Sequence, residues 1–260
     1  MKVEMTKITP ADAQRMLQLN TGNRPVNKSH VAVLAREMKL GQWKVNGDTI
    51  CMNGTRLIDG QHRLMAVVES GCTIQTLLVE GVDSDVFHTK DVGRRRSAGD
   101  TLAILGEVQT RKLASALIVV DRYMTGRMMQ RARYTNTEVV DLLAKYPGVR
   151  ESIGKTRETK RLVPNSVLTA CHYLFAQKDA DAASQFVVDL IGGHNLTEGD
   201  PVYVLRERLM KNALAKAKLQ SCYIMALMVK AWNHRRDDNT IRNLRFRQDG
   251  SNPETFPVVK

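Results

Sequence analysis

The stretch from Leu57 to Gly71 limits the possible folds of this chain most, because it predicts a strand, a tight turn and a helix in immediate succession. Leu57 and Ile58 form an apolar pair typical of the end of a buried strand. Asp59-Gly60 follows, and glycine adopts φ values that other residues avoid, which favours a turn here. Apolar residues then recur at helical spacing as far as Gly71, which is well placed to end the helix. The sequence therefore predicts a β–turn–α unit.

This turn has the properties of an anion site. The backbone amides of Gly60, Gln61 and His62 precede the first complete helical turn, so they lack intrahelical partners and lie at the positive end of the helix dipole. Arg63, and His62 when protonated, can add charge-assisted contacts to phosphate oxygens. Gly-x-x-Arg is also a common spacing in ordinary turns. The residues alone thus favour a phosphate site and a plain solvated turn about equally.

Four further segments accompany this turn in a set order along the chain. They are Asn23-Arg24-Pro25, Met38 to Trp43, the predicted strand around Ile50, and Asp91 to Ala98. Together with Asp59-Gly60-Gln61-His62-Arg63 they resemble the ParB/sulfiredoxin-fold proteins, including phage-encoded ParB-like proteins, which carry a DGQHR motif. The resemblance covers about residues 8–100. It implies a ParB/sulfiredoxin-like fold in which the loop before the helix holds nucleotide phosphates.

Two departures from the family pattern bear on the chemistry. Sulfiredoxins carry a cysteine immediately before the His-Arg pair, where this chain has Gln61, so the thiol for sulfinic acid repair is missing. ParB proteins that this chain resembles bind CTP or a related nucleotide, but they place further arginines where this chain has Gln61 and His62. The resemblance therefore implies a nucleoside triphosphate, CTP or ATP, and leaves the base and its hydrolysis open.

The same resemblance indicates which residues would form the nucleotide site. The phosphate-binding candidates are Gly60, Gln61, His62, Arg63, Asn23, Arg24, Arg94, Arg95 and Arg96. Without the resemblance, the arginine run is equally compatible with a solvated basic loop. Asp59 and Asp91 could position Mg²⁺ beside the phosphates, since this ion prefers a carboxylate plus substrate oxygens, although either residue could instead cap a turn. Asp59 and His62 are the catalytic candidates, with His62 stabilising charge or relaying a proton.

The charge balance predicts a polyanionic partner. The chain has 39 Lys and Arg against 27 Asp and Glu, a net charge of +12, which favours nucleic acid over a basic surface that only maintains solubility. From Arg94 to Arg161 there are 15 basic and 7 acidic residues. The candidate DNA contacts are Arg111, Lys112, Arg127, Arg131, Arg133, Lys155, Arg157, Lys160 and Arg161. Such contacts would be mostly electrostatic and strongly dependent on salt.

Secondary-structure signals predict an α+β protein with two domains. Strands are expected at 49–52, 56–58 and 74–79, and helices are expected to begin at Thr9-Pro10 and at Asn27 or Ser29. From Ser97 onward the pattern is almost entirely helical, including a capping box at Thr135-x-x-Glu138. We expect a mixed α/β domain at residues 1–100 and a mostly helical domain at 101–260. A helix-turn-helix between residues 135 and 177 is not evident, because the connection from 148 to 164 is long.

Several classes of protein are disfavoured. The first residues lack the apolar core of a signal peptide, no apolar run approaches the length of a membrane helix, and the four cysteines form no C-x-x-C pair. These features predict a cytoplasmic protein without a membrane partner, in the bacterial host cytoplasm if the gene is carried by a phage. The sequence leaves open whether the protein forms a homodimer. Two alternatives to nucleotide and DNA binding remain: a ParB-like metal-dependent nuclease or NTP hydrolase, and a regulatory protein-interaction module with a decayed pocket.

Overall fold

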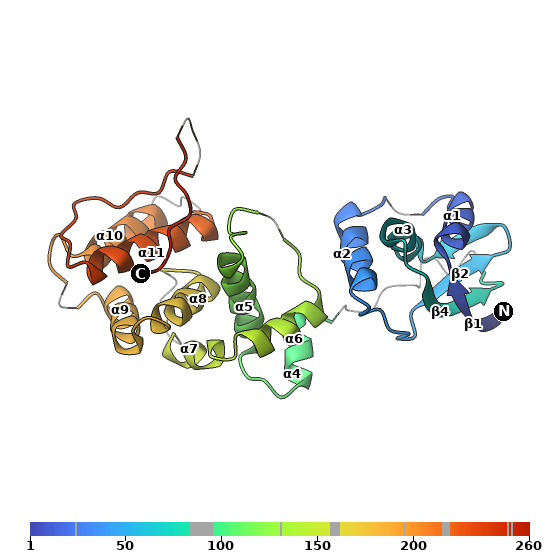
Figure 1. The fold of residues 1–260 in the computed structure, drawn as a ribbon, viewed down its shortest axis with the longest axis horizontal. Helices are drawn as coiled ribbons and strands as arrows, with labels where there is room; N and C mark the ends of the chain where they lie inside the picture. Colours follow the sequence, from blue (N-terminus) through green and yellow to red (C-terminus); the bar gives the residue numbers. More distant parts are fainter. Residues whose placement is uncertain are drawn as a thin grey trace. The chain divides into compact units, whose positions relative to one another are not determined.

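The computed structural model describes residues 1–23, 25–83, 96–130, 132–156, 162–194, 196–214, 219–248, 250 and 252–260. The chain divides into two compact units, which we call the first unit (residues 1–95) and the second unit (residues 96–260). Figure 1 shows the elements of both. The following candidate residues lie outside the described residues: Arg24, Asp91, Arg94, Arg95, Arg131, Arg157, Lys160 and Arg161.

The first unit is built on a four-stranded mixed sheet with the order β1-β4-β2-β3. Its strands are β1 (Lys2–Ile8), β2 (Thr49–Asn53), β3 (Arg56–Asp59) and β4 (Ile74–Glu80). β2 and β3 form an antiparallel hairpin, whereas β4 pairs parallel with β2 and antiparallel with β1. The predictions of β2, β3 and β4 are confirmed. β1 is an edge strand that the sequence analysis did not predict.

Three helices bury their apolar sides against one face of this sheet. They are α1 (Pro10–Gln18), α2 (Lys28–Lys39) and α3 (Gln61–Ser70). Their buried residues form one cluster with Ile8, Ile50 and Leu57 of the strands. The predicted helix starts are confirmed, since Thr9 caps α1 in a capping box and the Asn27 side chain accepts the His30 N–H at the start of α2. This core fixes the place where β3 turns into α3.

In the second unit, helices are the regular secondary structure of the residues described. Its helices are α4 (Ala98–Ile104), α5 (Thr110–Met124), α6 (Asn136–Lys145), α7 (Val149–Lys155), α8 (Asn165–Ala176), α9 (Ala180–Gly192), α10 (Pro201–Leu214) and α11 (Ser221–Arg236). α11 buries most of its middle part, and its Trp232 ring stacks on Phe175 at 4.4 Å between centroids and is 1% exposed. After α11 an extended segment packs Leu244 and Phe246 into the same cluster.

The mixed α+β class is therefore confirmed. Thr135 caps α6 as predicted, because its hydroxyl accepts the Glu138 N–H and the Glu138 carboxylate accepts the Thr135 N–H. The expected long connection between 148 and 164 instead contains α7, which buries Val149 and Ile153. Among the helices that the structure describes, none combines the length and apolarity needed to cross a bilayer.

Candidate phosphate-binding turn and basic surface

The turn between β3 and α3 has a backbone that requires glycine. Gly60 has φ +107°, a conformation that side chains rarely adopt, and a Cβ there would lie 3.0 Å from Ile50 Cγ1 and 3.3 Å from Ile50 Cα. The Asp59 carboxylate accepts the Gly60 N–H at 2.7 Å. The first residues of α3 therefore follow β3 without a longer loop. This geometry agrees with the predicted β–turn–α unit.

Gln61 and His62 point their side chains into the first unit. Gln61 is 5% and His62 is 7% exposed. The Gln61 Oε1 atom accepts the Asn20 side-chain amide at 3.1 Å, and the His62 Nε2 atom accepts the Asn27 backbone N–H at 3.0 Å. Accepting an N–H requires a lone pair on Nε2, so the imidazole is neutral in this arrangement. Both side chains tie the segment between α1 and α2 to the start of α3.

Asn23 belongs to the same arrangement. Its side-chain amide donates to the Leu57 carbonyl at 2.8 Å and to the Asn20 carboxamide oxygen at 2.5 Å. The structure thus brings the candidate Asn23 together with Gln61 and His62 around the β3–α3 turn. The sequence predicts these residues as phosphate ligands. Their hydrogen bonds to one another and to β3 cannot be read from the sequence, because the partners are more than 30 residues apart.

Arg63 lies between two carboxylates. Its Nη2 atom is 3.1 Å from Asp59 Oδ2 and its Nη1 atom is 3.3 Å from Asp48 Oδ2. The Arg63 side chain is 16% exposed, and its Nε atom is buried without a hydrogen-bond partner among the described residues. Asp48 is the accessible partner, with a side chain that is 60% exposed. A phosphate at this turn would therefore compete mainly with Asp48 for the guanidinium.

The metal candidates are only partly described. Asp59 contacts the Gly60 amide and Arg63, and its proposed companion Asp91 lies outside the described residues. Within the part of the chain that the structure describes, no three His, Cys, Asp or Glu side chains gather in a way that could hold a metal ion.

In the second unit, Lys112 and Arg127 are DNA-contact candidates whose partners the structure describes. Lys112 donates from Nζ to the carbonyls of Ile153 and Thr156 at the end of α7, at 3.3 and 2.8 Å. Arg127 pairs with Asp121 at 2.9 Å. The DNA-contact candidates Arg111, Arg133 and Lys155 are exposed, and so is the phosphate-binding candidate Arg96.

Asp121 is a buried carboxylate that joins three segments. It accepts the Tyr134 hydroxyl at 2.8 Å and the Tyr146 hydroxyl at 3.3 Å, in addition to its pair with Arg127. Burial and the Asp121 carboxylate raise the pKa of Tyr134 to about 12. Arg127 and Tyr134, both near the predicted DNA surface, are therefore oriented by a charge on α5.

His172 lies within a buried polar group on α8. Its Nδ1 atom is 2.9 Å from Ser152 Oγ and its Nε2 atom is 3.4 Å from Ser184 Oγ. Burial, with a smaller contribution from the Lys155 charge, lowers the pKa of His172 to about 4. Ser152 is 2% exposed. A serine this deeply buried cannot meet a substrate, so the pair connects α7, α8 and α9 within the core.

The sequence does not predict α7, and the presence of this helix shortens the connection that follows α6 to the length found in helix-turn-helix motifs. Only residues 146–148 separate α6 from α7, which is within the range of turns in that motif. α7 has seven residues, and Val149, Ser152 and Ile153 are buried. Its short exposed side offers little surface for a DNA groove, so the spacing alone does not define a recognition helix.

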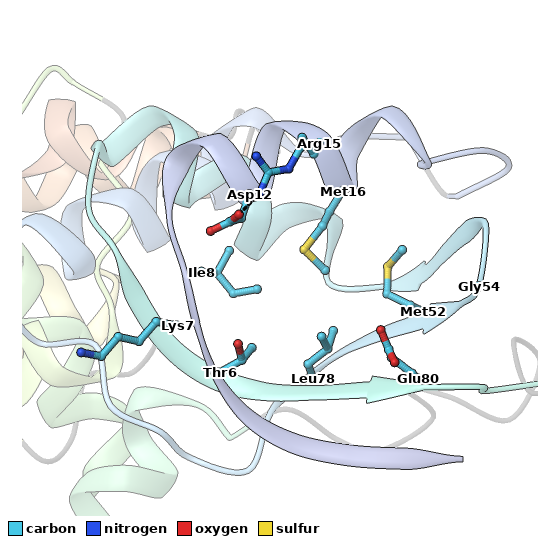
Figure 2. Close-up of a pocket in the computed structure, with 10 residues that line it drawn as sticks. All are labelled: Thr6, Lys7, Ile8, Asp12, Arg15, Met16, Met52, Gly54, Leu78 and Glu80. Atoms are coloured by element: carbon cyan, nitrogen blue, oxygen red, sulfur yellow. Dashed lines mark hydrogen bonds and ion pairs between the residues drawn. The ribbon is translucent and has the colours of Figure 1, made fainter.

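A separate hollow of about 320 Å³ lies between α1 and the sheet of the first unit. Figure 2 shows Ile8, Met16 and Leu78 around it, with Asp12 and Arg15 on α1 above the sheet. Asp12 pairs with Arg15 and also accepts from Thr9 in the capping box. The Asp12 carboxylate thus serves the start of α1, and we assign no chemistry to this hollow.

Comparison with known proteins gives no match: no protein-family model, curated protein or solved structure matches this chain.

Proposed function

We propose that this chain is a ParB-like protein that binds DNA through its second unit and a nucleotide through the β3–α3 turn of its first unit. The observation that carries the proposal is the uneven distribution of charge. The second unit has 26 Lys and Arg against 17 Asp and Glu, whereas the first unit has 13 against 10. A helical unit with this excess of cations attracts a polyanion, and the phosphate backbone of DNA is the simplest one.

Three exposed cations support a DNA-binding surface on the second unit. Arg111 lies in the first turn of α5, Arg133 precedes α6, and Lys155 ends α7. Side chains near the ends of helices reach backbone phosphates readily, and such contacts position a protein without reading bases. The proposal is therefore one of electrostatic DNA binding.

Titration of a labelled duplex at several salt concentrations tests DNA binding. We expect the affinity of the wild type to fall steeply between about 50 and 200 mM salt. Replacing Arg111 and Lys155 by Gln should make the slope of log K against log salt shallower by about 1.8, because each lost phosphate contact contributes about 0.9. The control variant Lys28→Gln/Lys178→Gln removes two exposed lysines outside the proposed surface. Absence of wild-type binding, or equal slopes in both double variants, contradicts the proposal.

The proposal that the first unit binds a nucleotide is supported by the geometry of the β3–α3 turn. The left-handed Gly60 places the N-terminus of α3 directly after β3, and the buried Arg63 Nε lacks an acceptor among the described residues. A phosphate near this turn would meet the positive end of α3 and the Arg63 guanidinium. Nucleotide binding would replace the contact between Arg63 and Asp48 and change the conformation of the first unit. This change would in turn alter the affinity of the chain for DNA.

Two substitutions with opposite effects test the nucleotide site. Arg63→Ala should weaken binding of CTP or ATP with Mg²⁺ at least about tenfold, since charge-assisted hydrogen bonds contribute about 1.5–3 kcal/mol. Asp48→Asn should strengthen binding, because it removes the accessible carboxylate that competes for Arg63. Lys39→Ala, an exposed change at the end of α2, is the control. A panel of fluorescent nucleotides titrated into each variant gives the affinities.

A second candidate function follows from the Asp48–Arg63–Asp59 contacts. If these ion pairs are structural, the turn is a decayed pocket and the chain is a regulatory interaction protein. In that case Arg63→Ala lowers the melting temperature of the first unit, while neither the wild type nor Asp48→Asn binds a nucleotide. The two functions therefore make opposite predictions for the same pair of variants.

A further inference from the structure

The second unit has a groove of about 760 Å³ beside α10. One wall is α10, which contributes Tyr203, Arg208 and Lys211, and the other is the extended segment 240–244. None of these residues is a candidate site residue on the sequence alone. None of them takes part in the β3–α3 turn.

The groove is held open by contacts at both ends of its extended wall. At one end the Ile241 N–H donates to the Gly199 carbonyl at 2.9 Å, next to the start of α10. Gly199 has φ +92°, and a Cβ there would lie 2.5 Å from Thr240 Cγ2. At the other end Leu244 is 2% exposed within the core. The segment therefore crosses beside α10 without filling the space between them.

The lining of the groove is rich in hydrogen-bond donors. Arg208, Lys211 and Arg242 supply three cations, and Asn243 adds a side-chain amide. Two acidic residues, Glu198 and Glu207, also line it, and Glu207 is 3.9 Å from Lys211 on the next turn of α10. The net charge of the lining is thus positive, and its cations come from both walls.

Arg208 supplies the most specific feature of the groove. Its Nε atom is buried and finds no hydrogen-bond acceptor among the described residues. An unmatched buried donor is unfavourable, so an oxygen from outside the chain that reached it would be bound more strongly than at an exposed arginine. The planar guanidinium fork suits the tetrahedral oxygens of a phosphate group.

Beyond the groove, the same extended segment continues the positive surface. Arg242, Arg245 and Arg247 are exposed, whereas the alternating residues Leu244 and Phe246 are buried. This alternation directs Arg245 and Arg247 outward as one strip. Arg242 is also exposed, although its position in the alternation corresponds to the side of Leu244, and the Arg247 Nε atom is 3.4 Å from a Glu254 carboxylate oxygen. A strip of this kind matches a chain of phosphates better than a single small anion.

We propose that the groove between α10 and segment 240–244 binds a backbone phosphate of nucleic acid. Arg208 receives the phosphate oxygens inside the groove, Lys211 and Arg242 contact them from the two walls, and Arg245 and Arg247 follow the neighbouring phosphates. This inference rests on the proposed DNA binding of the second unit and assigns it a surface that the sequence analysis did not identify.

The test is duplex binding by Lys211→Gln/Arg242→Gln, two exposed residues whose replacement leaves the core unchanged. We expect at least about tenfold weaker binding at low salt, and a slope of log K against log salt that is shallower by about 1.8. The control Lys28→Gln/Lys178→Gln carries the same change in charge. If the wild type binds the duplex and the two double variants behave alike, this inference is wrong and the proposed function stands. If the wild type does not bind, both fail.

Chemical acetylation of lysines gives a second readout that does not depend on substitution. DNA bound in the groove should protect Lys211 of the wild-type chain from an amine-reactive acetylating reagent, as measured by mass spectrometry, and leave Lys178 reactive. Equal modification of Lys211 with and without DNA, under conditions where anisotropy shows the duplex bound, overturns the proposal.

Discussion

At the turn before α3, neighbouring side chains have two different roles. Some hold the first unit together, and one could contact a ligand. Gln61 and His62 brace it, because each accepts a hydrogen bond from the segment between α1 and α2. Arg63 is different, since its partner Asp48 is largely exposed and can be displaced. The expectation that the Gly60 amide lacks a partner is wrong, because this N–H donates to the Asp59 carboxylate. A phosphate site at this turn would therefore consist of Arg63 and the positive end of α3 rather than of the whole pentapeptide.

The buried imidazole of His172 predicts that the stability of the second unit depends on pH. His172 has a pKa of about 4 in the folded state against 6.5 in a model peptide, so the folded state prefers the neutral imidazole. Above pH 6.5 this contribution to stability is complete, and it is lost as the pH falls toward 4. Between about pH 7.5 and pH 5 the free energy of unfolding should decrease by about 2 kcal/mol from this group.

Urea unfolding followed by Trp232 fluorescence measures this effect. A Trp43→Phe background removes the other tryptophan, which belongs to the first unit. His172→Gln, which does not titrate, should lose the difference between the two pH values that is due to this residue. An unchanged pH dependence in His172→Gln would show that other groups cause it.

At the scale of helices and strands, the sequence predicts those features whose interacting residues lie close together along the chain. The caps at Thr9, Asn27 and Thr135 and the strands β2 and β3 involve partners a few residues away, so they could be read from the sequence. β1 could not, because its partner β4 is about 70 residues away and only Ile8 of its side chains is fully buried. α7 was missed because seven residues give little periodicity, and the burial of Val149 and Ile153 depends on the surrounding helices. The pairing of Gln61 and His62 with the 20–27 segment is equally non-local.

The contribution of Asp121 to the free energy of unfolding can be measured, because its contacts join α5 to the segment that follows it and to the end of α6. This carboxylate on α5 is 4% exposed and receives Arg127, Tyr134 and Tyr146. Asp121→Ala leaves the Tyr134 and Tyr146 hydroxyls without their acceptor and removes the partner of Arg127, whose side chain is 43% exposed, so we expect a loss of about 1–3 kcal/mol in the free energy of unfolding.

The control for this prediction is Asp141→Asn, an exposed change on α6 that should alter stability by less than about 0.5 kcal/mol. Spectrophotometric titration adds an independent observation, because loss of the Asp121 charge should lower the pKa of Tyr134 from its value of about 12. If Asp121→Ala is as stable as Asp141→Asn, the carboxylate does not join these elements.

At the scale of the whole molecule, the two units have separate hydrophobic cores. The cluster under the sheet of the first unit and the cluster around α11 share no residue. Stability in each unit therefore depends on its own side chains, and a defect in one core should not propagate fully to the other. The same division assigns the nucleotide and the DNA of the proposed function to different units.

Two core substitutions in the full chain test this independence. Leu64 in the first unit and Leu117 in the second are both fully buried, and each Leu→Ala change should cost about 2–5 kcal/mol in its own unit because it leaves a cavity. Hydrogen–deuterium exchange, read peptide by peptide, should show that Leu64→Ala accelerates exchange in α3 and the sheet while α8 and α11 keep wild-type protection. Leu117→Ala should give the reverse pattern. Equal acceleration in both units by either substitution would mean that the chain unfolds as one cooperative body, and a nucleotide-dependent change in the first unit would then reach the DNA surface through shared stability.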